Sequence, residues 1–291
     1  MDITPELCSR LLVFQKTELT EYHIYANIAR RLKDVANRQV LEKISADELA
    51  HAHLWQKYTG QEVKPARGKI AFFTVISRVL GFTFAIKLME MGEEKAQGAY
   101  AALSDAIPEI NRWISDEEAH EQALIGMLDE ERLQYAGSVV LGLNDALVEL
   151  TGALAGFTLA LQNTRLIALT GLITGIAASL SMAASEYLST RSEETRKDPA
   201  RSALYTGVAY VITVALLILP YLLLDNYYVD LAIALVTAVL IIAGFNYYIS
   251  VARGGSFRRR FAEMAGISLG VAAFSFGIGY LVRLWLGVDA G

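Results

Sequence analysis

Residues 116–121 read Asp-Glu-Glu-Ala-His-Glu, and residues 142–148 read Gly-Leu-Asn-Asp-Ala-Leu-Val. The first stretch places a glutamate and a histidine three residues apart, on one side of a helix. The second places an aspartate inside a long apolar segment. Carboxylates and imidazoles bind metal ions, and an acid inside a membrane-spanning helix is costly enough to indicate a function. We therefore expect a metal ion to be gathered by one part of the chain and conducted by another.

The composition divides the 291 residues into two unlike halves. Residues 1–134 hold 21 acidic side chains, 16 Lys and Arg, and all four histidines. Residues 135–291 hold ten side chains of each charge and are strongly apolar. We predict an all-α protein with a helical bundle over 1–134 and a transmembrane helical bundle over 135–291. The acidic half favours a cation as partner and excludes nucleic acid, which requires a basic surface.

The cysteine content and the first residues restrict the architecture further. A single cysteine, Cys8, excludes an intrachain disulfide and a four-cysteine metal site. Residues 1–20 are polar and amphipathic and lack the apolar core of a signal peptide. We therefore expect the later apolar segments to insert the chain into the membrane.

Four helical regions are expected before the first apolar segment. Apolar residues with a period near 3.6 predict helices over 5–33 and 35–59, the second ending at Gly60. A third helical region begins near residue 70 and continues to about residue 104. A fourth begins near Pro108 and carries the Asp-Glu-Glu-Ala-His stretch.

Within the third region, residues 70–91 are apolar and interrupted by Gly81. The segment is short for a membrane span. We favour a helix that lies at the membrane interface or packs on a partner chain. A buried helix within the bundle and a short transmembrane span are the alternatives.

Five apolar segments of spanning length follow. They cover about 136–161, 166–188, 203–224, 229–251 and 262–286. The two loops 189–202 and 252–261 together carry eight Lys and Arg. The opposite ends of the spans carry two, Arg165 and Arg283. This bias predicts a multi-pass protein of the cytoplasmic membrane, with the N-terminal half in the cytoplasm and the C-terminus outside.

The N-terminal half contains two Glu-x-x-His pairs, Glu48/His51 and Glu117/His120. They fall on the second and the fourth expected helix. Two such pairs, with one glutamate from each of two other helices, form the di-metal site of ferritin-like bundles. The repeated pair therefore predicts a metal site.

The single carboxylates must come from the first and third helices. Glu18 and Glu93 are the preferred candidates, because a tyrosine follows each of them after seven residues. The rival candidates are Glu21, Glu90 and Glu94.

With these ligands, residues from about 5 to 130 resemble the rubrerythrin branch of the ferritin-like family. The resemblance implies a four-helix bundle that binds two iron ions and oxidises Fe(II) with peroxide or oxygen. Two features depart from that branch. There is no rubredoxin cysteine cluster, and the third helix has no second acid at the usual later position, where Glu90 is the candidate replacement.

The apolar half carries a second set of candidate ligands. Asp145 lies about ten residues into the first span, or roughly 15 Å along a helix. Glu149 follows it by four residues on the same face. Met182 and Glu186 have the same spacing in the second span. Carboxylate oxygens with a thioether suit Fe(II) or Mn(II) better than Ca(II).

The motifs over 142–148 and 181–187 resemble those of the vacuolar iron transporter family. That resemblance implies five spans, a homodimer, and exchange of Fe(II) or Mn(II) for protons. Plant members carry a glutamate-rich metal-binding insertion where this chain has only the short loop 189–202. The combined layout resembles the membrane-bound ferritin proteins of prokaryotes, which implies iron export.

We therefore expect an iron(II) or manganese(II) exporter, coupled to protons, in a lipid bilayer. Asp145 and Met182 would hold the ion in transit, and Glu149 and Glu186 would relay it or accept protons. The N-terminal half would bind a di-iron centre and oxidise, deliver or sense iron. The alternative is a membrane-anchored ferroxidase or peroxidase, but an anchor does not need five spans with acids inside them.

Overall fold

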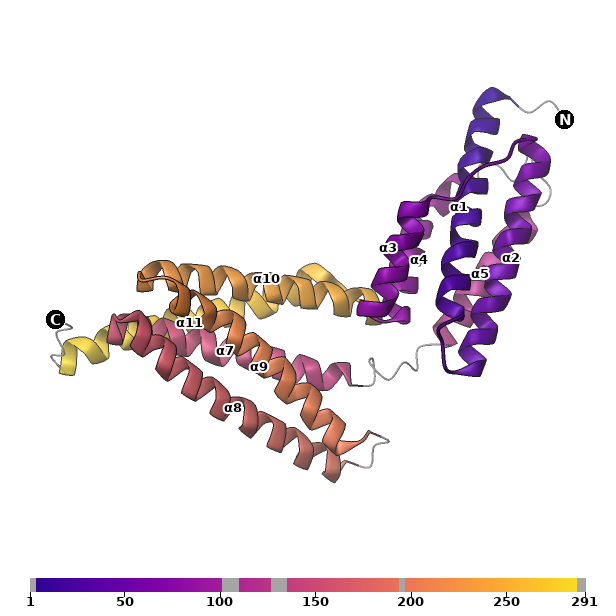
Figure 1. Ribbon diagram of the computed structural model, residues 1–291. Helices are drawn as coiled ribbons and strands as arrows, with labels where there is room; N and C mark the ends of the chain where they lie inside the picture. Colours follow the sequence, from indigo (N-terminus) through magenta and orange to yellow (C-terminus); the bar gives the residue numbers. More distant parts are fainter. Residues whose placement is uncertain (1–3, 101–109, 127–134, 194–196, 287–291) are drawn as a thin grey trace. The chain divides into compact units, whose positions relative to one another are not determined.

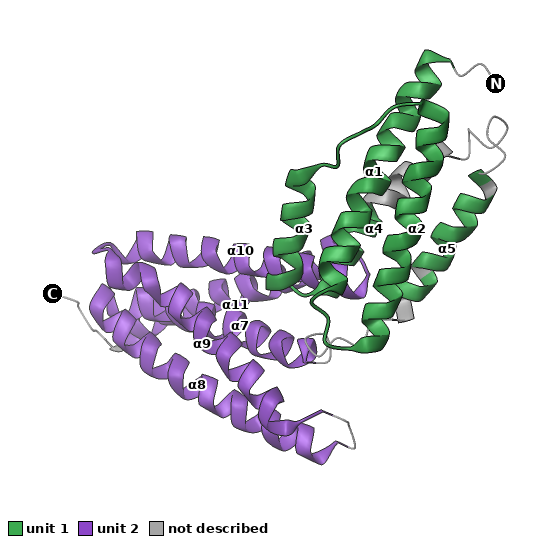
Figure 2. Cartoon of the chain, turned by 45° about the vertical axis from the view of Figure 1, so that its right-hand side comes forward, with its two compact units in different colours: residues 1–130 green, residues 131–291 purple. Residues whose placement is uncertain are grey.

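A computed structural model describes residues 4–100, 110–126, 135–193 and 197–286 of the chain (Figure 1). The side chains of residues 92–100, 111, 121, 125, 126 and 286 lie outside the description. In the described ranges the chain forms ten helices and no strand, which confirms the all-α prediction there. It divides into two compact units, residues 1–130 and 131–291, coloured green and purple in Figure 2.

Unit 1 begins with two long helices that pack along each other, α1 (Pro5–Ala29) and α2 (Val35–Thr59). The α1 helix ends four residues before the predicted position. The reason is local: the side chain of Asp34 caps α2 by accepting from the Asn37 N–H at 2.7 Å, and a capping residue is extended rather than helical. Gly60 ends α2 in the left-handed conformation, as predicted.

The described part of unit 1 contains three further helices, α3 (Arg67–Val79), α4 (Phe82–Tyr100) and α5 (Ile110–Gly126). The third predicted region is two helices because Gly81 adopts a φ of 97°, which breaks the helix. The α5 helix packs against α2 and α4, and α3 packs against α1 and α4. These contacts bring α1, α2 and α5 together at the predicted ligands.

The described residues of unit 2 form five helices: α7 (Ala136–Leu161), α8 (Thr164–Ser192), α9 (Pro199–Leu223), α10 (Tyr227–Arg253) and α11 (Phe257–Leu286). All five are long and apolar enough to cross a membrane, which confirms the predicted spans. Large apolar side chains on their outer faces are strongly exposed, for example Leu223 (70%) and Phe274 (71%). Such surfaces are stable in lipid rather than in water, so the chain is a multi-pass membrane protein.

The α7 helix is the centre of unit 2, because it packs against all four other helices. Its approach to α9 depends on Gly142: a Cβ there would lie 2.5 Å from the carbonyl oxygen of Thr206. The Thr206 hydroxyl in turn donates to the Ser138 carbonyl at 2.9 Å. Close packing through a small residue is typical of membrane helices. It places the acids of α7 beside α9.

Candidate metal centre

Three helices of unit 1 bring four of the predicted ligands into one group. Glu18 comes from α1, Glu48 and His51 from α2, and Glu117 from α5. One potential ligand atom from each lies within 4.8 Å of the other three. Glu18, Glu48 and His51 are buried, with 3%, 3% and 6% of their surface exposed. The group therefore lies inside the bundle, where a bound ion would be shielded from water.

The fifth ligand candidate, His120, extends this group. The Nδ1 atom of His51 lies 3.5 to 3.6 Å from Glu18 Oε2, Glu48 Oε2 and Glu117 Oε1. The Nδ1 atom of His120 lies 3.4 Å from Glu48 Oε1 and 4.0 Å from Glu117 Oε2. Glu48 and Glu117 thus each direct one oxygen towards each imidazole. Both carboxylates would therefore be available to an ion held by either imidazole.

Buried atoms without hydrogen-bond partners show that the site suits a cation. Four such atoms, Glu18 Oε2, Glu48 Oε2, His51 Nδ1 and His120 Nδ1, lie together in this group. Leaving one buried polar atom unsatisfied costs about 1–3 kcal/mol. Metal coordination would satisfy them together. Mixed carboxylate and imidazole ligands suit iron, manganese or zinc, whereas calcium prefers oxygen ligands alone.

Two aspartates orient the histidines from outside the group. Asp116 Oδ2 of α5 lies 3.4 Å from His51 Nε2 of α2. Asp47 Oδ2 of α2 lies 3.1 Å from His120 Nε2 of α5. A proton on Nε2, donated to the aspartate, leaves the Nδ1 lone pair for a metal ion. Each of the two helices therefore holds the histidine of the other.

Two buried tryptophans hold the remaining carboxylate. The indole N–H of Trp113 donates to Glu18 Oε1 at 3.0 Å, and that of Trp55 donates to the same oxygen at 3.4 Å. Because Oε1 already accepts both, Oε2 is the oxygen directed to the group. Sequence reasoning missed these tryptophans and the two aspartates. A signal was present, since Asp-Glu-x-Ala-His occurs at both 47–51 and 116–120.

The electrostatics of the group favour positive charge. Burial, followed by the charge of Glu48, raises the pKa of Glu18 to about 8. Burial alone would lower the pKa of His51, but the facing carboxylates of Glu117, Glu18 and Glu48 raise it to about 12. The pKa of His120 is also raised, against the effect of burial, mainly by Glu48. Either protons or metal ions must therefore neutralise this cluster.

The contribution of α4 is described only in part. The half-buried Glu90 accepts from the ammonium of Lys87 at 3.1 Å. The side chains of Glu93 and Glu94 lie outside the described residues. The rival Glu21 pairs with Lys69 at 3.2 Å. The α4 ligand thus stays a prediction.

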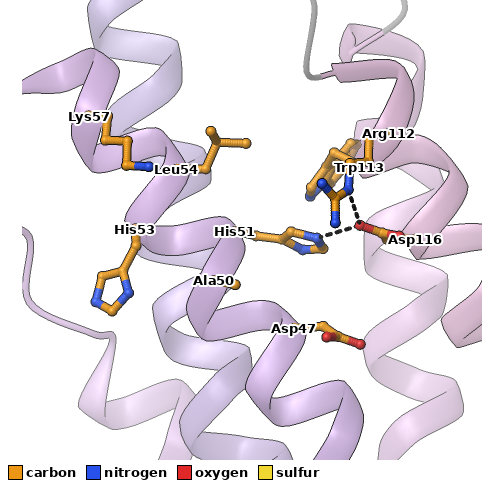
Figure 3. A pocket seen from close by; sticks show the side chains of 9 residues that line it. All are labelled: Asp47, Ala50, His51, His53, Leu54, Lys57, Arg112, Trp113 and Asp116. Carbon is orange, nitrogen blue, oxygen red and sulfur yellow. Dashed lines mark hydrogen bonds and ion pairs between the residues drawn. The ribbon is translucent and has the colours of Figure 1, made fainter.

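A cavity of about 420 Å³ adjoins the group (Figure 3). His51, Trp113, Asp47 and Asp116 line it, with Ala50, His53, Leu54, Lys57 and Arg112 around them. In Figure 3 the imidazole of His51 points towards Asp116 across the cavity. Small ions and molecules can therefore approach the group past the aspartates.

The predicted transport residues in unit 2 lie on α7 and α8. The Tyr210 hydroxyl of α9 donates to Glu149 Oε2 at 2.9 Å, and the Ser138 hydroxyl of α7 donates to Glu186 Oε1 at 2.6 Å. Asp145 interacts electrostatically with Glu149, and Met182 packs against the apolar core of unit 2. Among the described residues, the group of three or more acidic, His or Cys ligands is the one in unit 1. Within the described part of unit 2, Asp145 and Glu149 thus form a pair, and Glu186 has a separate partner in Ser138.

The fold and these sites define a multi-pass membrane protein with carboxylates inside its spans and a separate cluster of metal ligands. Residues 136–196 match the VIT family, so a VIT family domain covers α7 and α8. The match includes both motifs that resemble vacuolar iron transporters and confirms that resemblance over this stretch. No curated protein and no solved structure matches the chain.

Proposed function

We propose that this protein exports Fe(II) or Mn(II) across the cytoplasmic membrane in exchange for protons. The observation that carries the proposal is the set of carboxylates on α7 and α8, inside a segment that matches the VIT family. Asp145 and Met182 would hold the ion in transit. Glu149 and Glu186 would pass it on or accept protons, because their hydroxyl partners can remain bonded in either protonation state.

A homodimer belongs to this proposal. Glu149 lies in a spanning helix and is exposed in the single chain. An acid that faces lipid is unfavourable by about 2.5–3.5 kcal/mol near the bilayer centre. A second copy packed on α7 would remove that cost and would double the number of carboxylates near the pathway. The positive loops 189–202 and 252–261 support a cytoplasmic location for the N-terminal half.

Unit 1 would act as a ferritin-like di-metal domain. Glu18, Glu48, His51, Glu117 and His120 would hold two ions, with Glu93 or Glu90 from α4 as the remaining ligand. The cluster would bind iron and deliver it to the pathway, sense it or oxidise it. Oxidation conflicts with transport in one respect, because a divalent pathway is unsuited to Fe(III). Delivery or sensing without turnover is therefore the simpler role.

The experiment that tests transport is Fe(II) uptake into proteoliposomes under a pH gradient. The wild type is compared with Asp145→Asn, and Asp225→Asn serves as the control, because Asp225 lies exposed between α9 and α10. We expect flux in the wild type and the control and a loss of flux in Asp145→Asn. Absence of flux in all three would contradict the proposal.

The second candidate function is a membrane-anchored ferroxidase or peroxidase. The cavity beside His51 favours it, since an oxidant could reach the cluster there. Fe(II) oxidation by the purified protein, together with absence of flux in the same preparation, would support this alternative.

A further inference from the structure

One face of the α3 helix packs into the apolar core of unit 1. Phe73 is 6% exposed and lies in the apolar core with Ile70 and Ile76 beside it. Lys69 is also used internally, since it pairs with Glu21 at 3.2 Å and lies 5.9 Å over the Phe73 ring. This face fixes α3 on α1 and α4.

The opposite face of α3 is apolar as well and carries large side chains that are strongly exposed. Phe72 and Val75 are each 54% exposed, Val79 is 66% exposed, and Leu80 after the helix is 37% exposed. Their spacing of three and four residues places Phe72, Val75 and Val79 in one row along the helix. We call this row the outer face of α3. A row of exposed apolar side chains on a rigid helix indicates a docking surface.

The sequence around α3 is rich in cations, of which Lys69 and Lys87 pair with Glu21 and Glu90. Between Glu62 and Glu90 the chain contains no acidic residue and five cations, Lys64, Arg67, Lys69, Arg78 and Lys87. Arg78 lies beside further arginines at the end of α1. Burial, followed by the charges of Arg78 and Arg30, lowers the pKa of Arg31, so three guanidinium groups lie near one another where α1 and α3 end. Cations gathered beside an apolar face suit an anionic surface.

We propose that the outer face of α3 docks on the surface of an anionic lipid bilayer. Phe72, Val75 and Val79 would enter the boundary between headgroups and acyl chains, and Arg67 and Arg78 would extend to lipid phosphates. Amphipathic helices with cations beside an apolar face bind membranes in this way. Basic residues near an anionic surface each add to the attraction.

The length of the chain supports this partner. Nine residues separate the end of α5 at Gly126 from the start of α7 at Ala136, so the two ends are at most about 36 Å apart along a fully extended chain. The spans keep a bilayer within reach of unit 1 at all times, so docking is intramolecular and needs only a weak affinity.

A second copy of the chain is the competing partner. In a two-fold dimer the same surface patch meets itself. The outer face would then bring Arg67 and Arg78 of both copies together, which is unfavourable for like charges in contact. The sign of the charge therefore favours lipid over self-association.

The test uses the full chain with Cys8→Ala and one nitroxide label, reconstituted in liposomes that contain an anionic phospholipid. The label is placed at Val75→Cys on the outer face. The control label is at Val13→Cys, which is 60% exposed on α1. We expect the Val75 label to collide readily with oxygen and to be protected from a water-soluble nickel chelate. The Val13 label should remain accessible to the chelate. Equal accessibility at both sites would overturn the proposal.

A charge variant and a lipid series decide between lipid and a second copy. The Val75 label should become accessible to the chelate in the double variant Arg67→Gln and Arg78→Gln. It should also become accessible when the liposomes contain neutral lipid alone. The opposite result is that the Val75 label stays protected from the chelate in both the charge variant and the neutral liposomes, and loses that protection when the protein is diluted in lipid. That result would identify a second copy as the partner and overturn the proposal. Unchanged metal binding by unit 1 verifies that the variants are folded.

Discussion

At the residue level, the aspartates behind the histidines decide how the metal centre is oriented. Asp116 and Asp47 contact Nε2 of His51 and His120, so the Nδ1 atoms face the carboxylates. Such outer hydrogen bonds fix both the tautomer and the angle of a ligating imidazole. Their importance can be measured without any assay of transport.

We expect Asp116→Asn to weaken binding of Mn(II) or Co(II) to unit 1 by about 10–100-fold. The amide can present its NH₂ group to His51 and so stabilise the wrong tautomer. Glu118→Gln is the matched control, because Glu118 lies exposed two residues further along α5. The measurement is anaerobic titration calorimetry on the full chain. An affinity equal to that of the control would show that Asp116 does not position His51.

Metal affinity should also depend on pH in a definite direction. The pKa of Glu18 is raised to about 8 and that of His51 to about 12, so the folded chain holds these protons more tightly than the unfolded chain. Their stabilising effect is therefore present at low pH and is lost as the pH rises through these values. A metal ion must displace the same protons.

We thus expect Mn(II) affinity to rise with pH up to about 8, with release of protons on binding. Calorimetry in two buffers of different ionisation enthalpy measures the number released. A pH-independent affinity between pH 6 and 8, with no proton release, would contradict the assignment of Glu18 as a ligand.

Residue patterns predicted only those parts of the candidate metal centre whose residues are neighbours in the sequence. The pairs Glu48/His51 and Glu117/His120 are visible because three residues of a helix bring both side chains to one side. The Asp116–His51 and Asp47–His120 contacts join residues 65 and 73 positions apart, and helix periodicity contains no such information. The same holds for Trp113 and Glu18, which are 95 positions apart.

At the level of elements, the contact between α7 and α9 should be intolerant of a single methyl group. In Gly142→Ala the new Cβ would lie 2.5 Å from the Thr206 carbonyl oxygen, so the helices must separate. We expect a loss of about 1–3 kcal/mol in stability, seen as a lower unfolding temperature in detergent by circular dichroism.

Gly137→Ala provides the control on the same helix, because a Cβ there meets nothing within 4 Å. Alanine should be neutral or slightly stabilising at that position, since it favours helix over glycine. Equal unfolding temperatures for the two variants would mean that α7 and α9 do not pack closely in the membrane.

Helix existence was easier to predict than helix limits. The five spans follow from length and hydropathy alone, and the structure confirms them. The end of α1 was placed four residues too late, because the cap on α2 at Asp34 outweighs the helical pattern before it. The break at Gly81 needed the actual φ of 97°, which the sequence only suggests.

At the level of the whole molecule, the two sets of ligands should be separable. Glu117→Ala with His120→Ala should remove the metal bound to unit 1, because two of its proposed ligands are lost. Flux should persist in proteoliposomes, because Fe(II) supplied in solution reaches the carboxylates of unit 2 without delivery by unit 1. Asp145→Asn should abolish the flux and leave the metal content of unit 1 unchanged. Metal content by mass spectrometry and flux in proteoliposomes measure the two properties. Full metal content in the double variant would show that the cluster is not the binding site.

The group of Glu18, Glu48, His51 and Glu117 also has a consequence for how long the protein survives in a cell. An ion bound there would tie α1 to α5 and so close a loop of roughly 100 residues, which for a covalent link restricts the unfolded chain by about 4–5 kcal/mol. Reversible closure by a metal ion makes the lifetime of unit 1 depend on metal supply. Proteases would then remove the protein preferentially in metal-starved cells.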